Sequence, residues 1–329
     1  MIIRILKKIA LGLLAILVLC GLLLVTPRLW SAANTDKAPV GYGSLVPTYV
    51  AIKLGIETMI NRRPPVTSDI QEIKNVEYKN INGKSLQFDI YKQKSRKSTA
   101  PLIVFIHGGG WKSGDRADYL VYLLAFAKKG YVTATVSYRL LNLAPYPACA
   151  EDITDAVAWL FQHGDQYGYD PDRIALVGGS AGAHLAMLAA YDWKKSGSLP
   201  DTSTVLKHKV KAVVDIYGPT DFTTEFSRTN PTVTGFLKKS YAEAPQLYVE
   251  ASPIHYVSRN NPPTMILHGT SDQIVPISQS DLLKSKLDSL GVPAVYYKVP
   301  GWPHTMDAIE RVNKYSEAKM TDFFDRFLK

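Results

Sequence analysis

Short apolar segments alternate with segments of helical character over most of the chain, and this alternation limits the folds that the chain can adopt. Two segments, 76–78 and 86–91, predict an opening antiparallel pair of strands. Further predicted strands are 101–106, 131–136, 173–177, 211–216, 264–268 and 295–299, and predicted helices are 117–128, 149–163, 181–191, 278–290 and 313–328. Strands that are joined through helices pair in parallel. The sequence therefore predicts an α/β fold with a mostly parallel central sheet and helices on both faces.

A G-x-S-x-G motif occupies residues 178–182, between the predicted strand 173–177 and the predicted helix 181–191. A serine on so tight a strand-to-helix turn presents its hydroxyl above the sheet, and only small flanking residues allow the bend. We interpret Ser180 as a nucleophile. The turn also leaves the Ala181 N–H at a helix N-terminus, where it can stabilise negative charge. The alternative is an ordinary glycine-rich turn with a capping serine.

A second glycine-rich segment, His-Gly-Gly-Gly-Trp at 107–111, directly follows the apolar strand 101–106. Consecutive glycines let the backbone turn and present N–H groups at close range to a ligand. Such donors stabilise the oxyanion that forms during acyl transfer. We assign this role to Gly109 and Gly110, together with Ala181. The alternatives are a flexible loop or a phosphate cradle, but a cradle needs a spacing that Lys112-Ser113 lacks.

A nucleophilic serine needs an imidazole that takes its proton. His304 is the candidate base, because it follows the predicted strand 295–299 in a loop with the turn sequence Pro-Gly-Trp-Pro at 300–303. The other histidines downstream of Ser180 are interpreted as structural or surface residues: His184, His208, His255 and His268.

The acid that orients the imidazole is assigned to Asp272, in a turn directly after the predicted strand 264–268. Catalytic loops of open α/β sheets lie at the carboxyl ends of strands, so the loops of Asp272 and His304 are expected to be neighbours. Asp221 is the second choice. Asp215 lies inside a predicted strand, and Asp281 faces outward from a predicted helix. The alternative role of Asp272 itself is that of a turn or helix-capping residue.

Together these motifs resemble the α/β-hydrolase family, and within it the carboxylesterases with an HGG-type oxyanion loop. The similarity is to the hormone-sensitive-lipase-like and feruloyl-esterase-like (BD-FAE) branch. It rests on the segments 107–111, 178–182 and 269–272 and on His304, which follow the order and approximate spacing of that family. The segments 137–139 (Ser-Tyr-Arg) and 170–174 (Asp-Pro-Asp-Arg-Ile) are similar to it as well. The resemblance covers roughly residues 73–329.

The resemblance implies a serine carboxylic ester hydrolase that forms an acyl-enzyme, needs no cofactor or metal, and acts on small to medium acyl or aryl esters. One fold serves many substrates, so the family does not fix the ester. Two alternatives remain open at this point: an amide or peptide hydrolase of the same fold, and a non-catalytic surface-anchored binding protein.

Residues 219–262 are long for a connection in this pattern, which predicts a small cap insertion in the catalytic domain at 73–329. The insertion contains four aromatic side chains that either wall an acyl pocket or form a core of its own: Phe222, Phe226, Phe236 and Tyr241.

The N-terminal segment, 1–33, predicts a membrane anchor or a signal sequence. Arg4, Lys7 and Lys8 precede an uninterrupted apolar run at 9–25, and a basic flank on this side places the catalytic domain outside the cytoplasm. We favour an anchor that is retained. A protein that is secreted after cleavage near the Ser-Ala-Ala sequence at 31–33 is the alternative.

Residues 34–72 predict a linker with one helix, because Tyr49, Ile52, Ile56 and Ile60 recur at helical spacing and Pro64-Pro65 would end the helix. This helix is expected to pack on the domain surface. Alternatively, it lies at the bilayer interface or over the mouth of the active site.

The composition of the chain limits the kinds of molecule that it is expected to bind. The net charge is +9, but no basic stripe with interleaved aromatic residues occurs, which argues against nucleic acid and favours an anionic membrane or cell-wall polymer as the neighbour. The chain has two cysteines, Cys20 and Cys149, so a disulfide framework is not predicted. No spacing typical of metal ligands occurs either.

Overall fold

The computed structural model describes residues 2–96, 98–191 and 209–329. The chain forms two compact units. Unit 1 consists of Met1–Ile60, Gly269–Ile274 and Lys298–Ser316, and unit 2 of Asn61–His268, Val275–Tyr297 and Glu317–Lys329. Each unit is therefore assembled from segments that are distant in sequence.

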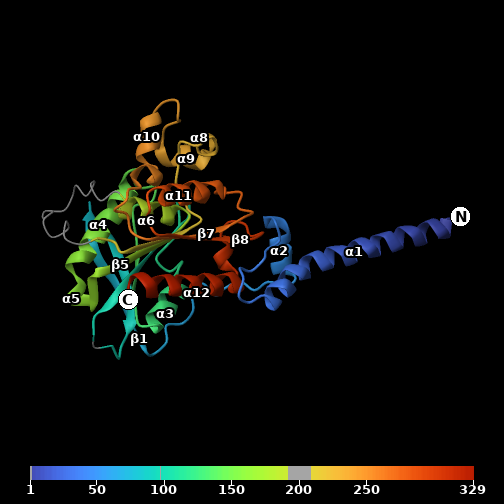
Figure 1. Cartoon of the computed structure of the whole chain (residues 1–329), viewed down its shortest axis with the longest axis horizontal. Helices are drawn as coiled ribbons and strands as arrows, with labels where there is room; N and C mark the ends of the chain where they lie inside the picture. Colours follow the sequence, from blue (N-terminus) through green and yellow to red (C-terminus); the bar gives the residue numbers. More distant parts are fainter. Residues whose placement is uncertain (1, 97, 192–208) are drawn as a thin grey trace. The chain divides into compact units, whose positions relative to one another are not determined.

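An eight-stranded sheet carries the fold, in the order β1-β2-β4-β3-β5-β6-β7-β8. Figure 1 labels β1, β5, β7 and β8 of this sheet. Its strands are β1 Ile70–Ile81, β2 Lys84–Gln93, β3 Ala100–Ile106, β4 Val132–Val136, β5 Tyr169–Gly179, β6 Ala212–Ile216, β7 Thr264–Gly269 and β8 Ala294–Val299. The ladders β1/β2 and β2/β4 are antiparallel, whereas β4/β3, β3/β5, β5/β6 and β6/β7 are parallel. The predicted mostly parallel sheet with an antiparallel opening pair is thus confirmed.

The opening pair is longer than the sequence pattern predicted. Asn82 and Gly83 separate β1 from β2, and both have positive φ angles, of 51° and 81°. An Asn-Gly pair with this backbone forms the two-residue turn that best matches the twist of a hairpin. The turn sequence, rather than the apolar pattern, therefore marks where the two strands meet.

Helices cover both faces of the sheet in unit 2. On one face, Phe105 of β3 stacks on Tyr122 of α3 (Leu120–Lys128), with ring centroids 5.9 Å apart. On the other face, Leu102 of β3 shares a buried cluster with Ile153 of α4 (Ala148–Gln162) and Leu185 of α6 (Ala181–Tyr191). Neighbouring residues of a strand point to opposite faces, so β3 is buried on both sides. The remaining helices of this alternation are α5 Gly164–Tyr167, α11 Ser278–Ser289 and α12 Glu310–Phe327.

The predicted insertion at 219–262 forms the helices α8 Glu225–Thr229, α9 Pro231–Leu237, α10 Pro245–Glu250 and η2 Pro253–Tyr256 (Figure 1). Phe222 and Phe236 are fully buried. Phe236 stacks on Trp111 with a centroid distance of 4.0 Å. These two rings therefore pack in the core that the insertion shares with Trp111 and the central sheet, rather than in a core of the insertion's own. Phe226 is exposed, and the Arg228 guanidinium lies 4.0 Å above the Tyr241 ring.

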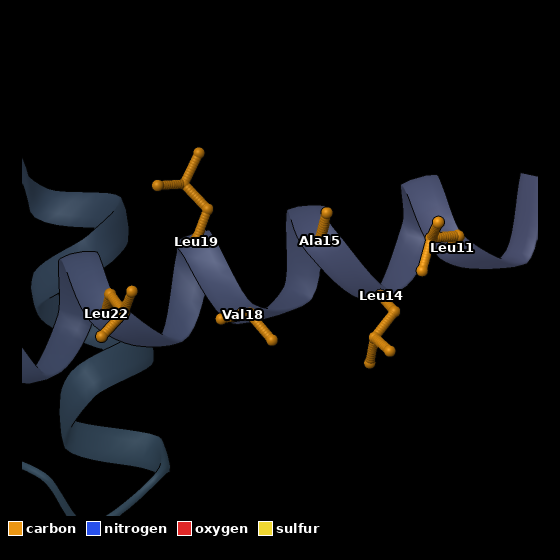
Figure 2. A pocket seen from close by; sticks show the side chains of 6 residues that line it. All are labelled: Leu11, Leu14, Ala15, Val18, Leu19 and Leu22. Atoms are coloured by element: carbon orange, nitrogen blue, oxygen red, sulfur yellow. The ribbon is translucent and has the colours of Figure 1, made fainter. Parts of the chain in front are cut away.

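In unit 1, α1 (Ile2–Ala33) contains, within Arg4–Ala33, an 18-residue apolar stretch with a mean hydropathy of 2.9. Figure 2 shows six of its side chains, which project from opposite sides of the helix: Leu11, Leu14, Ala15, Val18, Leu19 and Leu22. A helix that is apolar all round needs an apolar surrounding. This one is long enough to cross a bilayer, and a signal sequence has the same character.

The helix predicted within residues 34–72 is shorter than its sequence spacing suggested. α2 covers only Leu45–Lys53, because Gly55 with φ +70° follows the last turn, so the helix does not reach Ile56 and Ile60. Beyond the helix, Met59 bridges to Ile309, and the Glu310 N–H donates to the Thr58 carbonyl at 2.9 Å.

Candidate active site

Ser180 is the single residue between β5 and α6, and its backbone is left-handed with φ +55°. The Ser180 N–H donates to the Ile216 carbonyl of β6 at 2.9 Å, and the His184 N–H donates to the Ser180 carbonyl at 3.1 Å. A left-handed backbone is unfavourable for a residue with a Cβ and persists only where its surroundings hold it. The strand-turn-helix geometry expected for an exposed nucleophile is therefore present.

The glycines of this motif are required by close backbone contacts. A Cβ on Gly178 would overlap the backbone of Gly182, and one on Gly182 would overlap the carbonyls of Ile106 and His107. A Cβ on Gly179 would overlap the Tyr119 hydroxyl. The sharp turn thus requires glycine at 178 and 182, whereas at 179 a methyl group would first meet the end of the Tyr119 side chain.

The glycine loop after β3 lies directly beside this turn. A Cβ on Gly108 would come within 2.6 Å of the Gly179 carbonyl oxygen. Gly109 and Gly110 have φ angles of +101° and +59°, and within the described residues their N–H groups donate to no protein acceptor. The Ala181 N–H lies in the first turn of α6, where helices have no internal acceptor. Three backbone donors are thus available close to the serine turn.

His107 and Tyr138 support the glycine loop. Their rings stack with centroids 4.4 Å apart, and the Tyr138 hydroxyl donates to the His107 carbonyl at 2.9 Å. Burial lowers the pKa of His107, so the ring is held neutral. The Ser-Tyr-Arg segment that contains Tyr138 was recognisable in the sequence only as a family likeness, with no role assigned to it.

Asp272 and His304 are brought together in unit 1. The His304 Nδ1 lies 2.6 Å from the Asp272 Oδ2, and both side chains are almost fully buried. The other Asp272 oxygen, Oδ1, accepts the Ile274 N–H at 2.8 Å, which fixes the carboxylate. A carboxylate at Nδ1 stabilises the tautomer that carries its proton there and leaves Nε2 as the acceptor.

The other aspartates considered for the acid are Asp221, Asp215 and Asp281, and each lies in different surroundings. The Asp221 Oδ1 accepts both the N–H and the hydroxyl of Thr223, at 2.8 and 2.6 Å, and lies 4.0 Å from the His255 Nε2. Asp215 is buried in β6, where its Oδ1 accepts the Gly218 N–H at 2.7 Å, and burial raises its pKa to about 7. Asp281 is exposed on α11, as expected.

Two of the other histidines have structural contacts. His184 is fully buried, donates from Nε2 to the Ala251 carbonyl at 2.7 Å, and has its pKa lowered to about 4 by burial. His268 lies within 2.7 Å of the Ser280 hydroxyl and 2.9 Å of the Val275 carbonyl. His208 lies outside the described residues. Among the described residues, no group of three or more His, Cys, Asp or Glu is arranged to hold a metal ion.

A model of the BD-FAE family matches residues 88–287, which is more than half of the chain. The chain belongs to the BD-FAE family. The match begins in β2 and ends in α11, so it includes the glycine loop and the Ser180 turn. The α/β-hydrolase resemblance inferred from the motifs is confirmed.

Two curated relatives of this BD-FAE chain come from Mycobacterium tuberculosis. The probable carboxylic ester hydrolase LipM is 31% identical over 69% of this chain and 54% of its own length. Esterase LipC is 30% identical over 76% of this chain and 64% of its own length. The chain therefore spans between about half and two thirds of these relatives.

Solved structures agree on the fold. A truncated carbohydrate esterase from gut microbiota is 28% identical, with a TM-score of 0.68, over 78% of this chain and 95% of that one. A propionate-bound esterase from Thermogutta terrifontis is 24% identical and superposes with a TM-score of 0.68 over 80% of this chain and 96% of that one. The BD-FAE chain has the α/β-hydrolase fold.

Proposed function

We propose that this protein is a serine carboxylic ester hydrolase that acts through an acyl-enzyme on small to medium acyl or aryl esters. The two curated relatives named above are a probable carboxylic ester hydrolase and an esterase. In this mechanism the Ser180 Oγ attacks the acyl carbon, the alcohol leaves, and water then releases the acid by the same route.

His304 accepts the serine proton at Nε2 and delivers it to the leaving alcohol. The hydrogen bond of 2.6 Å between its Nδ1 and Asp272 supports this role, because it holds the tautomer whose Nε2 is unprotonated. Asp272 also stabilises the imidazolium that forms transiently.

The N–H groups of Gly109, Gly110 and Ala181 bind the oxyanion. Donors that are held in place before the reaction need no reorganisation when the charge develops, and each contributes about 3–4 kcal/mol in comparable enzymes. The left-handed glycines and the helix N-terminus support this assignment.

Sheet topology supports a common site for the three side chains. Strands β5, β6 and β7 are parallel neighbours, Ser180 follows the carboxyl end of β5, and Asp272 follows that of β7. His304 follows β8 in the chain. Residues that follow the carboxyl ends of parallel strands lie at one edge of a sheet.

The observation that carries the proposal is the left-handed Ser180 between β5 and α6. The test is the turnover of p-nitrophenyl esters with acyl chains of two to about eight carbons, feruloyl esters and acetylated sugars by the full chain, by Ser180→Ala and by Ser113→Ala. We expect Ser180→Ala to lose activity by about 10⁴-fold or more while its unfolding curve stays unchanged, and Ser113→Ala to remain active. Undiminished turnover by Ser180→Ala would refute the proposal. Faster cleavage of matched p-nitroanilides than of esters would favour an amide hydrolase.

We also propose that α1 is a retained membrane anchor with the catalytic domain outside the cytoplasm. The basic residues at its start support this orientation. The Ser31 hydroxyl at its end accepts hydrogen bonds from the Arg311 guanidinium at 2.7 Å and from the Val40 N–H at 3.0 Å, contacts that cleavage after residue 33 would remove. Intact mass of the membrane fraction after alkaline carbonate extraction tests this. A soluble protein that begins near residue 34 would contradict it.

A further inference from the structure

Residues 39–60, which we name the N-terminal brace, lie along the loop that precedes His304. The Gly41 N–H donates to the Pro300 carbonyl at 2.7 Å, and the Gly43 N–H donates to the Gly301 carbonyl at 2.8 Å. A Cβ on Gly41 would overlap the Gly301 carbonyl. The brace thus contacts the histidine loop through its backbone, at a position where only glycine fits.

Trp302 connects the brace to both members of the Asp-His pair. Its side chain is fully buried, and its Nε1–H donates to the Pro39 carbonyl at 2.8 Å. Its own carbonyl accepts the Ser271 N–H at 3.0 Å, next to Asp272. Trp302 also lies two residues before His304. Movement of this one residue would therefore displace both turns.

Arg311 forms a buried ion pair with Glu57 of the brace and also contacts Trp302. The Arg311 guanidinium binds both carboxylate oxygens of Glu57 at 2.7–3.0 Å, and the Glu57 side chain is 1% exposed. The same guanidinium lies 4.7 Å from the centre of the Trp302 ring and donates to the Val40 carbonyl at 2.8 Å. The planar guanidinium group of an arginine has several N–H donors and can bind all these partners at once, which a lysine side chain could not.

We propose that the N-terminal brace is a positioning element for His304, acting through Trp302 and Arg311. This inference rests on the proposed function, in which His304 is the base. A base contributes to catalysis only while its geometry is held, and a displacement of about 1 Å can reduce the rate about 100-fold. Because Arg311 also binds Ser31 at the end of α1, the brace joins the anchor to the histidine loop.

The test uses the full chain in detergent micelles, with Gly41→Ala as the variant and Gly21→Ala as the matched control. A Cβ on Gly21 has no heavy atom within 4 Å. Competent sites are counted by the p-nitrophenol released on inactivation with a p-nitrophenyl organophosphate, and turnover is then expressed per titrated site. We expect kcat per site of Gly41→Ala to fall about 10- to 100-fold, with KM changed less than about twofold. A merely structural role would lower the number of sites and leave kcat per site unchanged.

Trp302→Phe provides a second variant in case Gly41→Ala does not fold. It keeps an aromatic side chain at this position but removes the indole Nε1–H that donates to Pro39, together with part of the buried ring. We expect a smaller fall of kcat per site, about threefold to tenfold, again without a matching change in KM. Unchanged kcat per site in the folded variants would overturn the inference, whereas a wild-type chain that neither turns over esters nor releases p-nitrophenol would instead refute the proposed function.

The outer face of α2 carries large apolar side chains that are exposed. The exposed fraction is 74% for Val46 and 59% for Tyr49, whereas Thr48 and Ala51 on the inner face are buried. The Lys53 ammonium lies 5.2 Å from the centre of the Tyr49 ring. Aromatic and lysine side chains of this kind are typical of the region where a bilayer meets water.

We infer that the face of α2 formed by Leu45, Val46 and Tyr49 lies in the interface of the bilayer that holds α1. The bilayer is the occupant that fits, because α2 belongs to the same unit as the proposed anchor and follows it after 11 residues, 34–44. The Arg28 guanidinium near the end of α1 donates to the Ile56 carbonyl just beyond α2, which ties the two segments together.

The test places an environment-sensitive nitrobenzoxadiazole label at Val46→Cys, with Glu243→Cys as the exposed control, both in a Cys20→Ser background. Cys149 is buried with its pKa raised to about 12 and would not react. In vesicles of phosphatidylcholine and phosphatidylglycerol, we expect the label at 46 to be quenched by lipid-borne doxyl groups and protected from aqueous iodide, and the control to behave oppositely. Iodide quenching at 46 equal to that of the control would overturn the inference. Protection that is lost when protein is diluted at constant lipid would do so too, because it would indicate a second copy.

Discussion

The surroundings of Ser180 and those of His304 are held in different ways. Around Ser180, the contacts are between backbone segments that meet at glycines, such as Gly178 against Gly182. Around His304, the loop is held by side chains and backbone groups from distant parts of the chain, including Pro39, Glu57 and Arg311. The first arrangement depends on glycines that are grouped in two short motifs, and the second on packing between residues about 250 positions apart.

This difference explains where motifs are informative. A turn that excludes side chains leaves a local signature of glycines in the sequence, whereas a buried ion pair such as Glu57–Arg311 leaves none. We therefore expect substitutions in the two regions to have different effects on the structure. Substitutions near Ser180 should disrupt the backbone geometry of the turn, and substitutions near His304 should free the loop that carries the histidine.

The largest expected effect concerns the acid. Asp272→Asn should lower kcat by about 10⁴-fold with esters of short acids, because an amide favours the wrong imidazole tautomer. Asp221→Asn is the matched control, since its carboxylate binds Thr223, and it should change kcat less than about threefold. A larger loss in Asp221→Asn would reverse the assignment of the acid.

Loss of the buried ion pair should give the next largest effect, on stability. Glu57→Ala removes the carboxylate partner of Arg311, whose side chain is 19% exposed, and should lower the free energy of unfolding by about 3–5 kcal/mol. Glu243→Ala, at an exposed turn with Ser240, should leave the urea midpoint almost unchanged. Equal urea midpoints for the two variants would show that the brace is not held by this pair.

The Ser180 turn can be tested in the same way. Gly178→Ala should destabilise the protein by about 3 kcal/mol, because the new methyl group would overlap the backbone of Gly182. Gly12→Ala, where a Cβ has nothing within 4 Å, is the control in thermal unfolding. If Gly178→Ala were as stable as this control, the close contacts would not be what requires glycine there.

The smallest effect is a dependence on pH. Burial raises the pKa of Asp215 to about 7, whereas an unfolded aspartate titrates near 3.9. The folded chain thus holds a proton that the unfolded chain releases, so stability falls as the pH rises from about 4 to 7. Asp215→Asn has no proton to release at this position. The free energy of unfolding of this variant, measured in urea relative to the wild type, should therefore increase by about 2 kcal/mol between pH 5 and pH 7. A constant difference would contradict a neutral Asp215.

Sequence analysis predicted the order of strands and helices from the opening pair onward, because apolar periodicity reports burial directly. Helix 181–191 was predicted with its observed bounds, since the turn at Ser180 marks its start. The brace was missed for a physical reason: the contacts of Pro39, Gly41 and Glu57 follow no local spacing in the chain, and they become visible only when their partners at 300–311 are packed against them. Helical spacing at Ile56 and Ile60 was misleading because Gly55 ends the helix first.

The proposed mechanism depends on Ser180 as the nucleophile. It can be tested by treating the full chain with a fluorophosphonate, measuring the intact mass and mapping the adduct by peptide mass spectrometry. We predict a single adduct on Ser180, absent from Ser180→Ala and formed far more slowly in His304→Ala. An adduct on another residue, or a wild-type chain that does not react under conditions in which a known serine esterase is fully labelled, would contradict it.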